Sequence, residues 1–558
     1  MNDLRAATRA LILCAGSLLA VHAGAQQLAF PTAEGSGRFA TGGRGGDVYE
    51  VTTLNASGPG SIVDAVSAGN RTIVFRVSGT IALGTTILKP KANTTIAGQT
   101  APGDGICLKG RLQISASNVI VRHIRVRVDA GGANSSGDAV DISGGSDIIV
   151  DHVSASYSRD EGISCTEVPA NVTVQWCIIS EALTFEAHGY GSLIRGDYGD
   201  KRTYHHNLYA HNTARNPRPG NYTVIGTDSV GNFVDFRNNV VYNWAGTYAG
   251  YNDDSTMLTS YNVVGNAYVT GSESSGFFAF REGCRVCNGY FADNAINGVV
   301  PADPWSTVTF RATLNSAHIA AYKARSTPVA MPPVITTSPA QAYTDVLARA
   351  GACIPKRDTI DRRIVRDVID RTGHSIDSTV HQPEGAWPAL ASLPAPADGD
   401  HDGMPDVWEN ARGLNPTDPA DRNAAGPGGY TQLETYLNSL VGETITSIPG
   451  EPNGVPVDYA LLQNYPNPFN PHTVISYRLP VAGHAMLTVY DGLGRAVRTL
   501  VNAHADAGVH DVLFDAAGLA AGVYYYRLQV RPSDSAPGRD PRNGAGSYSA
   551  TKSLLLMK

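Results

Sequence analysis

The chain has 558 residues, a formal charge of −7, 59 glycines and only 17% charged residues. Charged residues usually make up about a quarter of a globular domain, so the composition excludes a disordered polyelectrolyte, a coiled coil and a long-helix protein. It favours an all-β chain with many turns, and the length predicts about three or four domains. The isoelectric point near 6.1 gives no global basic field for nucleic acid.

Residues 1–25 have the pattern of an export signal. Two arginines precede an apolar stretch from Ala10 to Val21, and residues 23–25 form a small-x-small cleavage site. The apolar stretch is shorter than the about 20 residues that span a membrane. We therefore expect an exported protein without a transmembrane segment. Cys14 offers lipidation as an alternative.

Six cysteines follow the signal, and an even number in an exported protein permits disulfides without fixing their pairing. They are Cys107, Cys165, Cys177, Cys284, Cys287 and Cys353. The Cys284–Cys287 pair is a CxxC motif with no second pair, so a zinc site would lack two ligands. The motif predicts a loop disulfide or two free thiols.

Six similar apolar segments recur between residues 93 and 264. They are VRHIRVR from Val121, VDHVSAS from Val150, VQWCIIS from Val174, YHHNLYA from Tyr204, FRNNVVY from Phe236 and TSYNVVG from Thr259. Their spacings of 29, 24, 30, 32 and 23 residues fall within the periods of about 20–50 residues that are typical of solenoids. Strands and turns without helical periodicity predict a parallel β-helix. Unrelated strands of a sandwich are the alternative.

The aligned segments predict three columns. Strand alternation places the first residues inside the solenoid and the second residues in a polar column facing water. The second residues are Arg122, Asp151, Gln175, His205, Arg237 and Ser260. The fourth residues include Asn207, Asn239 and Asn262, whose amides can hydrogen-bond along the stack.

The chain resembles the pectate lyases of the pectate/pectin lyase family over about residues 30–390. The resemblance lies in the order and spacing of several motifs. They include TGGRGGDVYEVTTLNASGPGS (41–61), GQTAPGDG (98–105), GDAVDISGGSDIIVDHVSASYSRDE (137–161), HGYGSL (188–193) and TYHHNLYAHNTARNPR (203–218). It implies a right-handed parallel β-helix that cleaves polygalacturonate by β-elimination with calcium as cofactor.

The distribution of charge independently favours this chemistry. Residues 151–200 contain eight carboxylates and two arginines, and the next segment is basic. Asp160 and Arg215 lie eight and nine residues beyond their strand anchors, which predicts the same turn column two rungs apart, about 10 Å at about 4.8 Å per rung. A polyanionic substrate needs a hard cation such as Ca²⁺ to bridge it to carboxylates.

The resemblance assigns calcium binding to Asp151 and Asp160. Many relatives have a second aspartate where this chain has Ser164, which leaves fewer charged ligands unless Glu161 replaces one. A solvated strand residue is the alternative for Asp151.

The resemblance assigns proton removal to Arg215 and substrate carboxylate binding to Arg218. An arginine base conflicts with the high pKa of guanidinium groups, so we expect an alkaline optimum. His188 or Tyr190 stands near the place where relatives carry a substrate-binding lysine. A surface salt bridge is the alternative for Arg215, and a loop residue without a role is the alternative for His188.

Residues 302–395 change to helical patterns. Ser338 is an N-cap before QAYTDVLARAG, and residues 361–372 form a charged amphipathic pattern. The resemblance implies that these helices cover the solenoid.

A sharper calcium signal follows at residues 398–409. Acidic residues occupy places 1, 3, 5, 9 and 12 of a 12-residue loop, namely Asp398, Asp400, Asp402, Asp406 and Glu409, with Gly403 at place 6. This spacing is typical of an EF-hand-type calcium loop. A second acidic cluster (Asp418, Asp421, Asn423) follows it. A solvated linker is the alternative.

Residues 442–457 form a Pro- and Gly-rich linker, and residues 458–558 predict a small β-sandwich. The motif LLQNYPNPFNP (461–471) precedes five strand patterns, which begin at Thr473, Ala485, Ala496, Asp511 and Gly522. This region resembles the C-terminal sorting domain of the type IX secretion system, which implies the secretion machinery as a partner. A carbohydrate-binding sandwich is the alternative.

These observations predict a secreted or cell-surface, calcium-dependent lyase acting on de-esterified homogalacturonan as a monomer. We expect an export signal (1–25), a β-helix domain with covering helices (26–395), a calcium module (396–441), a linker (442–457) and a C-terminal sandwich (458–558). The alternatives are a pectin lyase acting on methyl-esterified chains without metal, and a non-catalytic β-helical adhesin or carbohydrate-binding protein.

Overall fold

The computed structural model describes residues 26–129, 137–167, 169–184, 188–378, 385–443, 459–461, 464, 472–505, 508–532 and 548–556. The expected export signal and most of the expected linker lie outside these residues. The chain divides into two compact units, described separately below. The first ends near residue 445 and the second begins at Thr446, with Pro427–Gly429 grouped with the second. The described residues include no helix long and apolar enough to cross a membrane.

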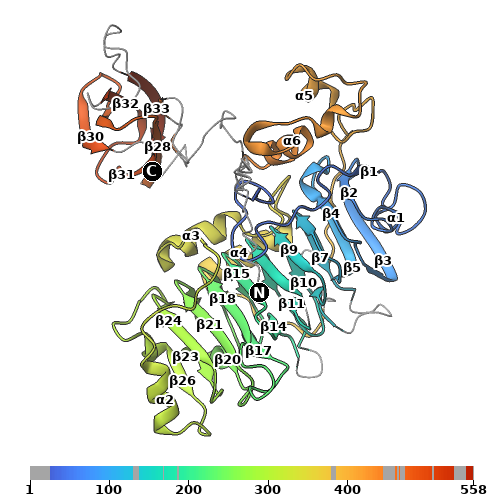
Figure 1. Cartoon of the computed structure of the whole chain (residues 1–558), viewed down its shortest axis with the longest axis vertical. Helices are drawn as coiled ribbons and strands as arrows, with labels where there is room; N and C mark the ends of the chain where they lie inside the picture. Colours follow the sequence, from blue (N-terminus) through green and yellow to red (C-terminus); the bar gives the residue numbers. More distant parts are fainter. Residues whose placement is uncertain are drawn as a thin grey trace, which may run out of the picture. The chain divides into compact units, whose positions relative to one another are not determined.

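Ten strands in the described part of the first unit form one parallel sheet, paired in chain order. They are β1 (Asp47–Val51), β2 (Arg71–Phe75), β4 (Thr94–Ala97), β6 (Val119–Arg122), β9 (Ser146–Asp151), β12 (Ala170–Gln175), β15 (Lys201–His205), β18 (Asn232–Arg237), β21 (Thr259–Val264) and β24 (Asn288–Ala292). Each turn of the chain adds one strand beside the last, as Figure 1 shows.

A second parallel sheet has thirteen strands among the described residues. They are β3 (Gly79–Leu88), β5 (Ile106–Ile114), β7 (Ile124–Arg127), β8 (Val140–Ile142), β10 (Ser154–Ser156), β11 (Ile163–Cys165), β13 (Ile178–Ser180), β14 (Leu193–Gly196), β16 (Leu208–Ala210), β17 (Arg218–Asn221), β19 (Val240–Tyr242), β22 (Ala267–Val269) and β25 (Ala295–Ile296). A third parallel sheet contains β20 (Gly246–Asn252), β23 (Ser274–Glu282) and β26 (Val308–Phe310). The prediction of a parallel β-helix is confirmed.

The strand register confirms the predicted inner column for five of the six segments. Val121, Val150, Val174, Tyr204 and Phe236 are successive partners across neighbouring strands. The sixth partner is Val263 rather than the predicted Thr259. The sixth segment was therefore aligned four residues too early, because β21 reaches its corner at Gly265.

Two ladders run along the corners of the solenoid. The asparagine amides of Asn207, Asn239, Asn266 and Asn294 hydrogen-bond in succession at 3.0, 3.1 and 2.9 Å. The prediction is thus confirmed at its first two members, and Asn266 replaces Asn262 as the third. Next to it, the rings of His123, His152, Trp176 and His206 stack with centroid distances of 4.6, 6.1 and 4.3 Å.

The polar column beside these ladders is buried, so the expectation that it faces water is wrong for most of its members. Arg122, Asp151, Gln175 and His205 are at most 2% exposed. The N-terminal segment covers them, with the ring of Phe30 lying 3.7 Å from the Arg122 guanidinium carbon. Alternation along a strand reveals which residues point outward, but not which distant segment packs over them.

Helices and short loops complete the first unit. The helices are α1 (Ile62–Ala65), α2 (Ser316–Lys323), α3 (Pro339–Arg349), α4 (Thr359–Asp370), α5 (Asp406–Asn410) and α6 (Gln432–Leu440). The predicted cap Ser338 accepts a hydrogen bond from the Gln341 amide at the start of α3. Apolar residues of α3 and α4 pack against β13, β16 and β19, which confirms that they cover the solenoid.

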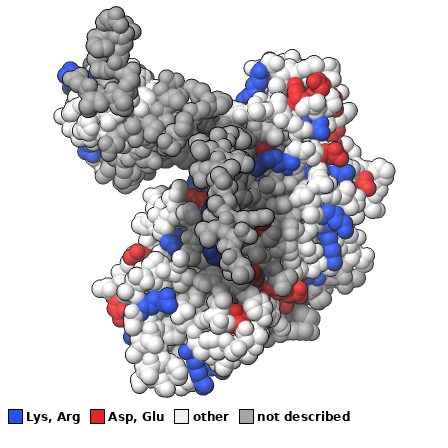
Figure 2. Space-filling view, viewed as in Figure 1, with Lys and Arg blue, Asp and Glu red and all other residues white. Residues whose placement is uncertain are grey.

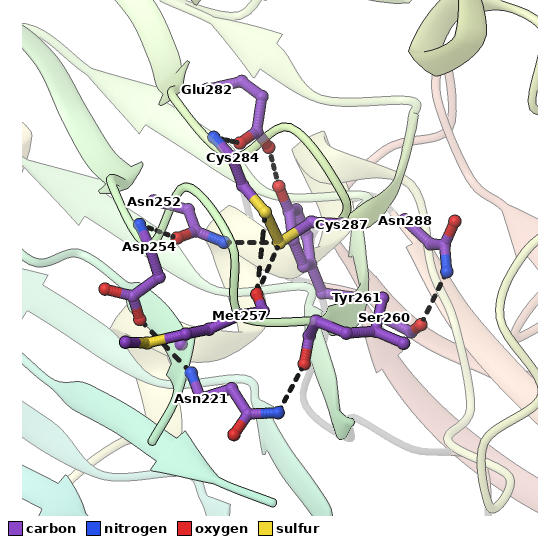
Figure 3. The surroundings of a disulfide bond; sticks show 12 residues. Asn221, Asn252, Asp254, Met257, Ser260, Tyr261, Glu282, Cys284, Cys287 and Asn288 are labelled. Carbon is purple, nitrogen blue, oxygen red and sulfur yellow. Dashed lines mark hydrogen bonds between the residues drawn. A yellow bond between two sulfur atoms is a disulfide. The ribbon is translucent and has the colours of Figure 1, made fainter. Parts of the chain in front are cut away.

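Cys284 and Cys287 form a disulfide in the loop between β23 and β24, one of the two outcomes predicted for the CxxC motif. Figure 3 shows the bond beside the Met257 carbonyl, which lies 3.6 and 3.3 Å from the two sulfur atoms. The Asn252 amide contacts Cys287 at 3.3 Å. The disulfide therefore stabilises residues 252–257, the loop that follows β20.

The region 396–441 packs directly on the first rungs of the solenoid. Met404, Leu433 and Leu437 share a buried cluster with Val74 and Ala97, which come from β2 and β4. Helix α6 begins with a capping box between Thr431 and Glu434. Apart from Pro427–Gly429, this region is therefore part of the first unit.

The second unit consists of two antiparallel sheets. One contains β27 (Ala460–Leu461), β28 (His472–Leu479) and β31 (Gly508–Asp515); the other contains β29 (Gly483–Tyr490), β30 (Ala496–Ala505), β32 (Gly522–Pro532) and β33 (Tyr548–Leu556). The sheets contribute to one buried apolar cluster. The five predicted strands are present, and β27 and β33 were not predicted. The motif at 465–471 lies outside the described residues.

Candidate active site

The candidate active site lies at the point where four neighbouring strands begin. β8, β11, β14 and β17 are consecutive in the second sheet, and isolated bridges pair Glu161 with Tyr190 and Tyr190 with Ala214. The residues just before these strands therefore lie in one row along the solenoid, and Asp160 and Arg215 belong to it, as expected.

Three carboxylates converge at one end of this row. One oxygen from each of Asp138, Asp160 and Glu161 lies within 4.8 Å of the other two. The Ser164 hydroxyl donates to Asp138, so position 164 does belong to the cluster. Burial and then the neighbouring Asp138 raise the pKa of Glu161 against the opposing effect of Arg215, and burial also raises the pKa of Asp138. Clustered carboxylate oxygens of this kind suit a hard cation such as Ca²⁺.

Arg215 reaches back from its turn to this cluster. Its guanidinium pairs with Glu161 and lies 3.8 Å from Asp160. The guanidinium carbon lies 3.9 Å from the centre of the Tyr190 ring, a cation–π contact that fixes its position. Although burial alone would lower it, the Glu161 carboxylate raises the pKa of Arg215. The cationic form is therefore favoured in this arrangement.

Two further predicted residues flank the row. Arg218 begins β17 and pairs with Asp254 at 3.4 Å, and Arg195 pairs with the same carboxylate at 3.3 Å. His188 is half-buried, and its Nε2 lies 3.9 Å from Asp160. The structure thus brings Arg215, Arg218, His188 and Tyr190 to one side of the solenoid.

Asp151 does not belong to this site, and its assignment needs correction. It ends β9 in the other sheet and is fully buried, accepting hydrogen bonds from Arg122 at 2.7 Å and Gln175 at 2.9 Å. Although burial alone would raise it, His152 and Arg122 lower the pKa of Asp151. The Arg122 guanidinium also contacts Glu443. Asp151 therefore fixes the Arg122 side chain, which in turn binds Glu443 just after α6.

The third cleft carboxylate is Asp138, which sequence reasoning missed. Asp138 stands two residues before β8, and Glu161 stands two residues before the neighbouring β11. Ile163 is the partner of Val140, so the two carboxylates occupy equivalent places. The signal was the equal offset of an acidic residue before two short apolar strands, but β8 lay outside the aligned segments.

A second acidic cluster lies in the 398–421 region. Its members form two overlapping groups, Asp398, Asp400 and Asp402, and then Asp402, Glu409 and Asp421. Both oxygens of Asp400 and of Glu409 are buried without a hydrogen-bond donor among the described residues. Burial and then neighbouring carboxylates raise the pKa values of Asp402 and Glu409 to about 7. Figure 2 shows acidic side chains gathered over this region near α5.

One predicted loop ligand lies outside this second cluster. The Asp406 carboxylate accepts a hydrogen bond from the Gly399 amide at 2.7 Å and stands in the first turn of α5. Asp421, from the weaker acidic cluster in the sequence, takes its place. The loop therefore gathers carboxylates from both acidic segments.

Comparison with known proteins places the chain in a family. The chain is 38% identical to probable pectate lyase C of Aspergillus fumigatus over 421 residues, 75% of this chain and 94% of the relative. The identity is also 38% to the protein of that name from Neosartorya fischeri and 36% to that from Aspergillus terreus, again over 75% of this chain and 94% and 96% of the relatives. No family model matches the chain.

A solved structure, the major allergen from cedar pollen, aligns over 57% of this chain and 92% of that chain at 18% identity and a TM-score of 0.42, too distant to carry an argument. The identity and coverage of the sequence relatives are enough to show the family. The chain is a polysaccharide lyase and belongs to the pectate lyase family.

Proposed function

We propose that this protein is a calcium-dependent pectate lyase that cleaves de-esterified homogalacturonan by β-elimination. The observation that carries the proposal is a cluster of three carboxylates at the beginning of the strands of the second sheet. Two of these carboxylates pair with the Arg215 guanidinium. Carboxylates alone would repel a polyuronate, and a bound cation removes that repulsion.

Asp138, Asp160 and Glu161 are the residues that would hold the cation. Asp160 Oδ1 is buried and lacks a hydrogen-bond donor among the described residues, so a ligating oxygen is available. When bound, Ca²⁺ supplies positive charge that acidifies the proton on carbon 5 of the uronate. Ser164 supplies a hydroxyl where a carboxylate would bind more strongly, so we expect weak cation binding in the absence of substrate.

Arg215 is the proposed base. Its contact with Glu161 keeps it cationic, so it can accept a proton only when that carboxylate is engaged elsewhere or the pH is alkaline. General-base action contributes about 10²–10⁴-fold. Charge stabilisation by Arg218, which we assign to the substrate carboxylate, adds to it. His188 and Tyr190 border the sugar where relatives carry a lysine.

The ultraviolet absorbance of the unsaturated product tests this function. We expect polygalacturonate to be cleaved, a chelator to stop the reaction, and added calcium to restore it. Cleavage of methyl-esterified pectin that ignores chelator would instead support a pectin lyase, although the acidic cluster would then have no purpose. Binding without any cleavage would support a carbohydrate-binding protein.

We further propose that the 398–421 region binds a second calcium ion. The orphaned oxygens of Asp400 and Glu409 support a resident cation, and Asp398 and Asp402 complete the loop. Because Met404 packs on the solenoid, this ion would hold the module on the first rungs. Calcium-dependent melting of the intact protein tests this role.

We also propose that the protein is exported as a monomer through its N-terminal signal and reaches the medium or cell surface through its C-terminal unit. The shared apolar cluster of the two antiparallel sheets supports a sandwich. Removing residues 458–558 should abolish surface delivery and leave the specific activity of the purified protein intact. Lost activity in a folded truncation would contradict this separation.

A further inference from the structure

A groove of about 410 Å³ opens beside the candidate active site. Its lining includes three tyrosines, one arginine and one aspartate, namely Tyr190, Tyr248, Tyr251, Arg281 and Asp253. Tyr190 is the residue that also lies against the Arg215 guanidinium. The groove therefore continues the row of active-site residues. Aromatic walls with a few fixed polar groups are typical of ligand-binding clefts.

The groove follows the solenoid toward its later rungs. The Tyr251 amide donates to the Pro217 carbonyl at 3.1 Å, and Tyr251 is the strand partner of Arg281. Arg281 therefore lies two rungs beyond Pro217, about 10 Å at about 4.8 Å per rung. A polymer lying along the row would present Arg281 with a different sugar unit from the one at Arg215.

Arg281 is held in a fixed position. Its Nη2 pairs with Asp253 at 2.5 Å, and its guanidinium carbon lies 4.3 Å from the Tyr248 ring centre and 5.4 Å from that of Tyr251. Its Nε is buried and has no hydrogen-bond acceptor among the described residues. A guanidinium fixed against aromatic rings is well suited to bind a carboxylate with little loss of side-chain freedom.

The loop after β20 partly neutralises the arginines along this groove. Each of its two adjacent carboxylates, Asp253 and Asp254, forms ion pairs with two arginines. Asp254 pairs with Arg195 at 3.3 Å and Arg218 at 3.4 Å, and Asp253 pairs with Arg281 at 2.5 Å and Arg311 at 3.6 Å. Each group of two arginines and one carboxylate retains one positive charge. The disulfide at residues 284–287 stabilises this loop through Met257.

We propose that the groove is a further binding position for an acidic sugar, in which Arg281 pairs with the carboxylate of a uronate unit and Tyr248 and Tyr251 border its ring. The proposal rests on the proposed action on polygalacturonate. It implies that the enzyme gains affinity from chains long enough to extend from Arg215 to Arg281.

Kinetics on oligogalacturonates of increasing length test the position. For Arg281→Gln we expect KM to rise about tenfold on long oligomers, with a much smaller change on the shortest oligomer that is cleaved. Arg281→Lys should recover only part of the loss, because an ammonium lacks the guanidinium fork. Arg311→Gln is the matched control, because Arg311 shares Asp253 but does not line the groove, and it should resemble the wild type.

Calorimetry with a long oligogalacturonate provides a readout that needs no turnover. Weaker binding by Arg281→Gln than by Arg311→Gln supports the position even if the wild type proves inactive, which would overturn the proposed function alone. An equal loss on short and long oligomers would assign Arg281 a merely structural role and overturn the proposal. Unchanged affinity for the long oligomer would also overturn it.

Discussion

The two acidic clusters of the first unit differ in how their carboxylates are balanced. In the cleft, Glu161 pairs with Arg215 and Asp138 accepts from Ser164. In the loop, the oxygens of Asp400 and Glu409 have no donor among the described residues. A cluster already balanced by protein groups can take up a cation conditionally, with the substrate. A cluster without such balance requires a cation to be stable. Under the proposed function, the cleft would hold a catalytic calcium and the loop a structural one.

The largest expected effect on activity comes from replacing Arg215, the cationic residue of the cleft. Arg215→Ala should lower turnover on polygalacturonate by at least about 10², because it removes the proposed base. Arg215→Lys should recover little, since a compact ammonium cannot reproduce the guanidinium geometry. Steady-state rates with saturating calcium measure both. Near-normal turnover in a folded variant would remove Arg215 from the mechanism.

The loop cluster should control stability instead. A calcium concentration of a hundred times Kd stabilises a folded protein by about 2.7 kcal/mol, and Asp421→Asn should remove most of this gain. Asp406→Asn is the matched control, because its carboxylate bonds to the Gly399 amide outside the cluster. Calorimetric melting with and without calcium measures the difference. A larger loss for Asp406→Asn would restore the ligand set predicted from the spacing alone.

The same cluster predicts a pH dependence. The pKa values of Asp402 and Glu409 rise to about 7 on folding, from about 4 in an unfolded chain. Without calcium, stability should therefore fall as the pH rises from about 4 to about 7, because only the unfolded state ionises freely. Calcium competes with these protons, so its stabilising effect should grow between about pH 5 and about pH 8. Melting temperatures across this range check both trends, and a flat calcium effect would contradict them.

The smallest expected effect is at Ser164. Ser164→Asp should tighten calcium binding in the cleft about tenfold, or about 1.4 kcal/mol, because it adds a carboxylate beside Asp138. Ser164→Ala, which removes only the hydroxyl, is the matched control. Calorimetry in an Asp421→Asn background measures calcium binding at the cleft without the loop site. Deleting the loop instead would expose the apolar surface on which Met404 packs. Equal affinities for the aspartate variant and the wild type would place residue 164 outside the calcium shell.

Local patterns predicted the solenoid but only part of the site. The inner column, the first members of the asparagine ladder and the shared row of Asp160 and Arg215 follow from short-range periodicity and similar offsets. The close approach of the two side chains, 3.8 Å instead of the expected gap of about 10 Å, did not follow. Asp151 and Asp138 could not be told apart in this way. What separates them is the sheet to which each belongs and the partner it finds there. Asp151 ends β9 and pairs with Arg122, which distant segments cover through Phe30 and Glu443. Asp138 stands before β8, beside Asp160 and Glu161. The sequence likewise did not predict that Asp421 joins the loop cluster, because only the fold brings the two acidic segments together.

The calcium dependence of the lyase rate tests the separation of the two clusters most directly. Initial rates on polygalacturonate would be measured against free calcium for the wild type, Asp138→Asn and Asp421→Asn, well below their melting temperatures. We predict that Asp138→Asn raises the half-saturating calcium concentration at least about tenfold, whereas Asp421→Asn leaves it unchanged. An equal shift in both variants, or a shift in Asp421→Asn alone, would contradict the assignment of catalysis to the cleft cluster and of stability to the loop.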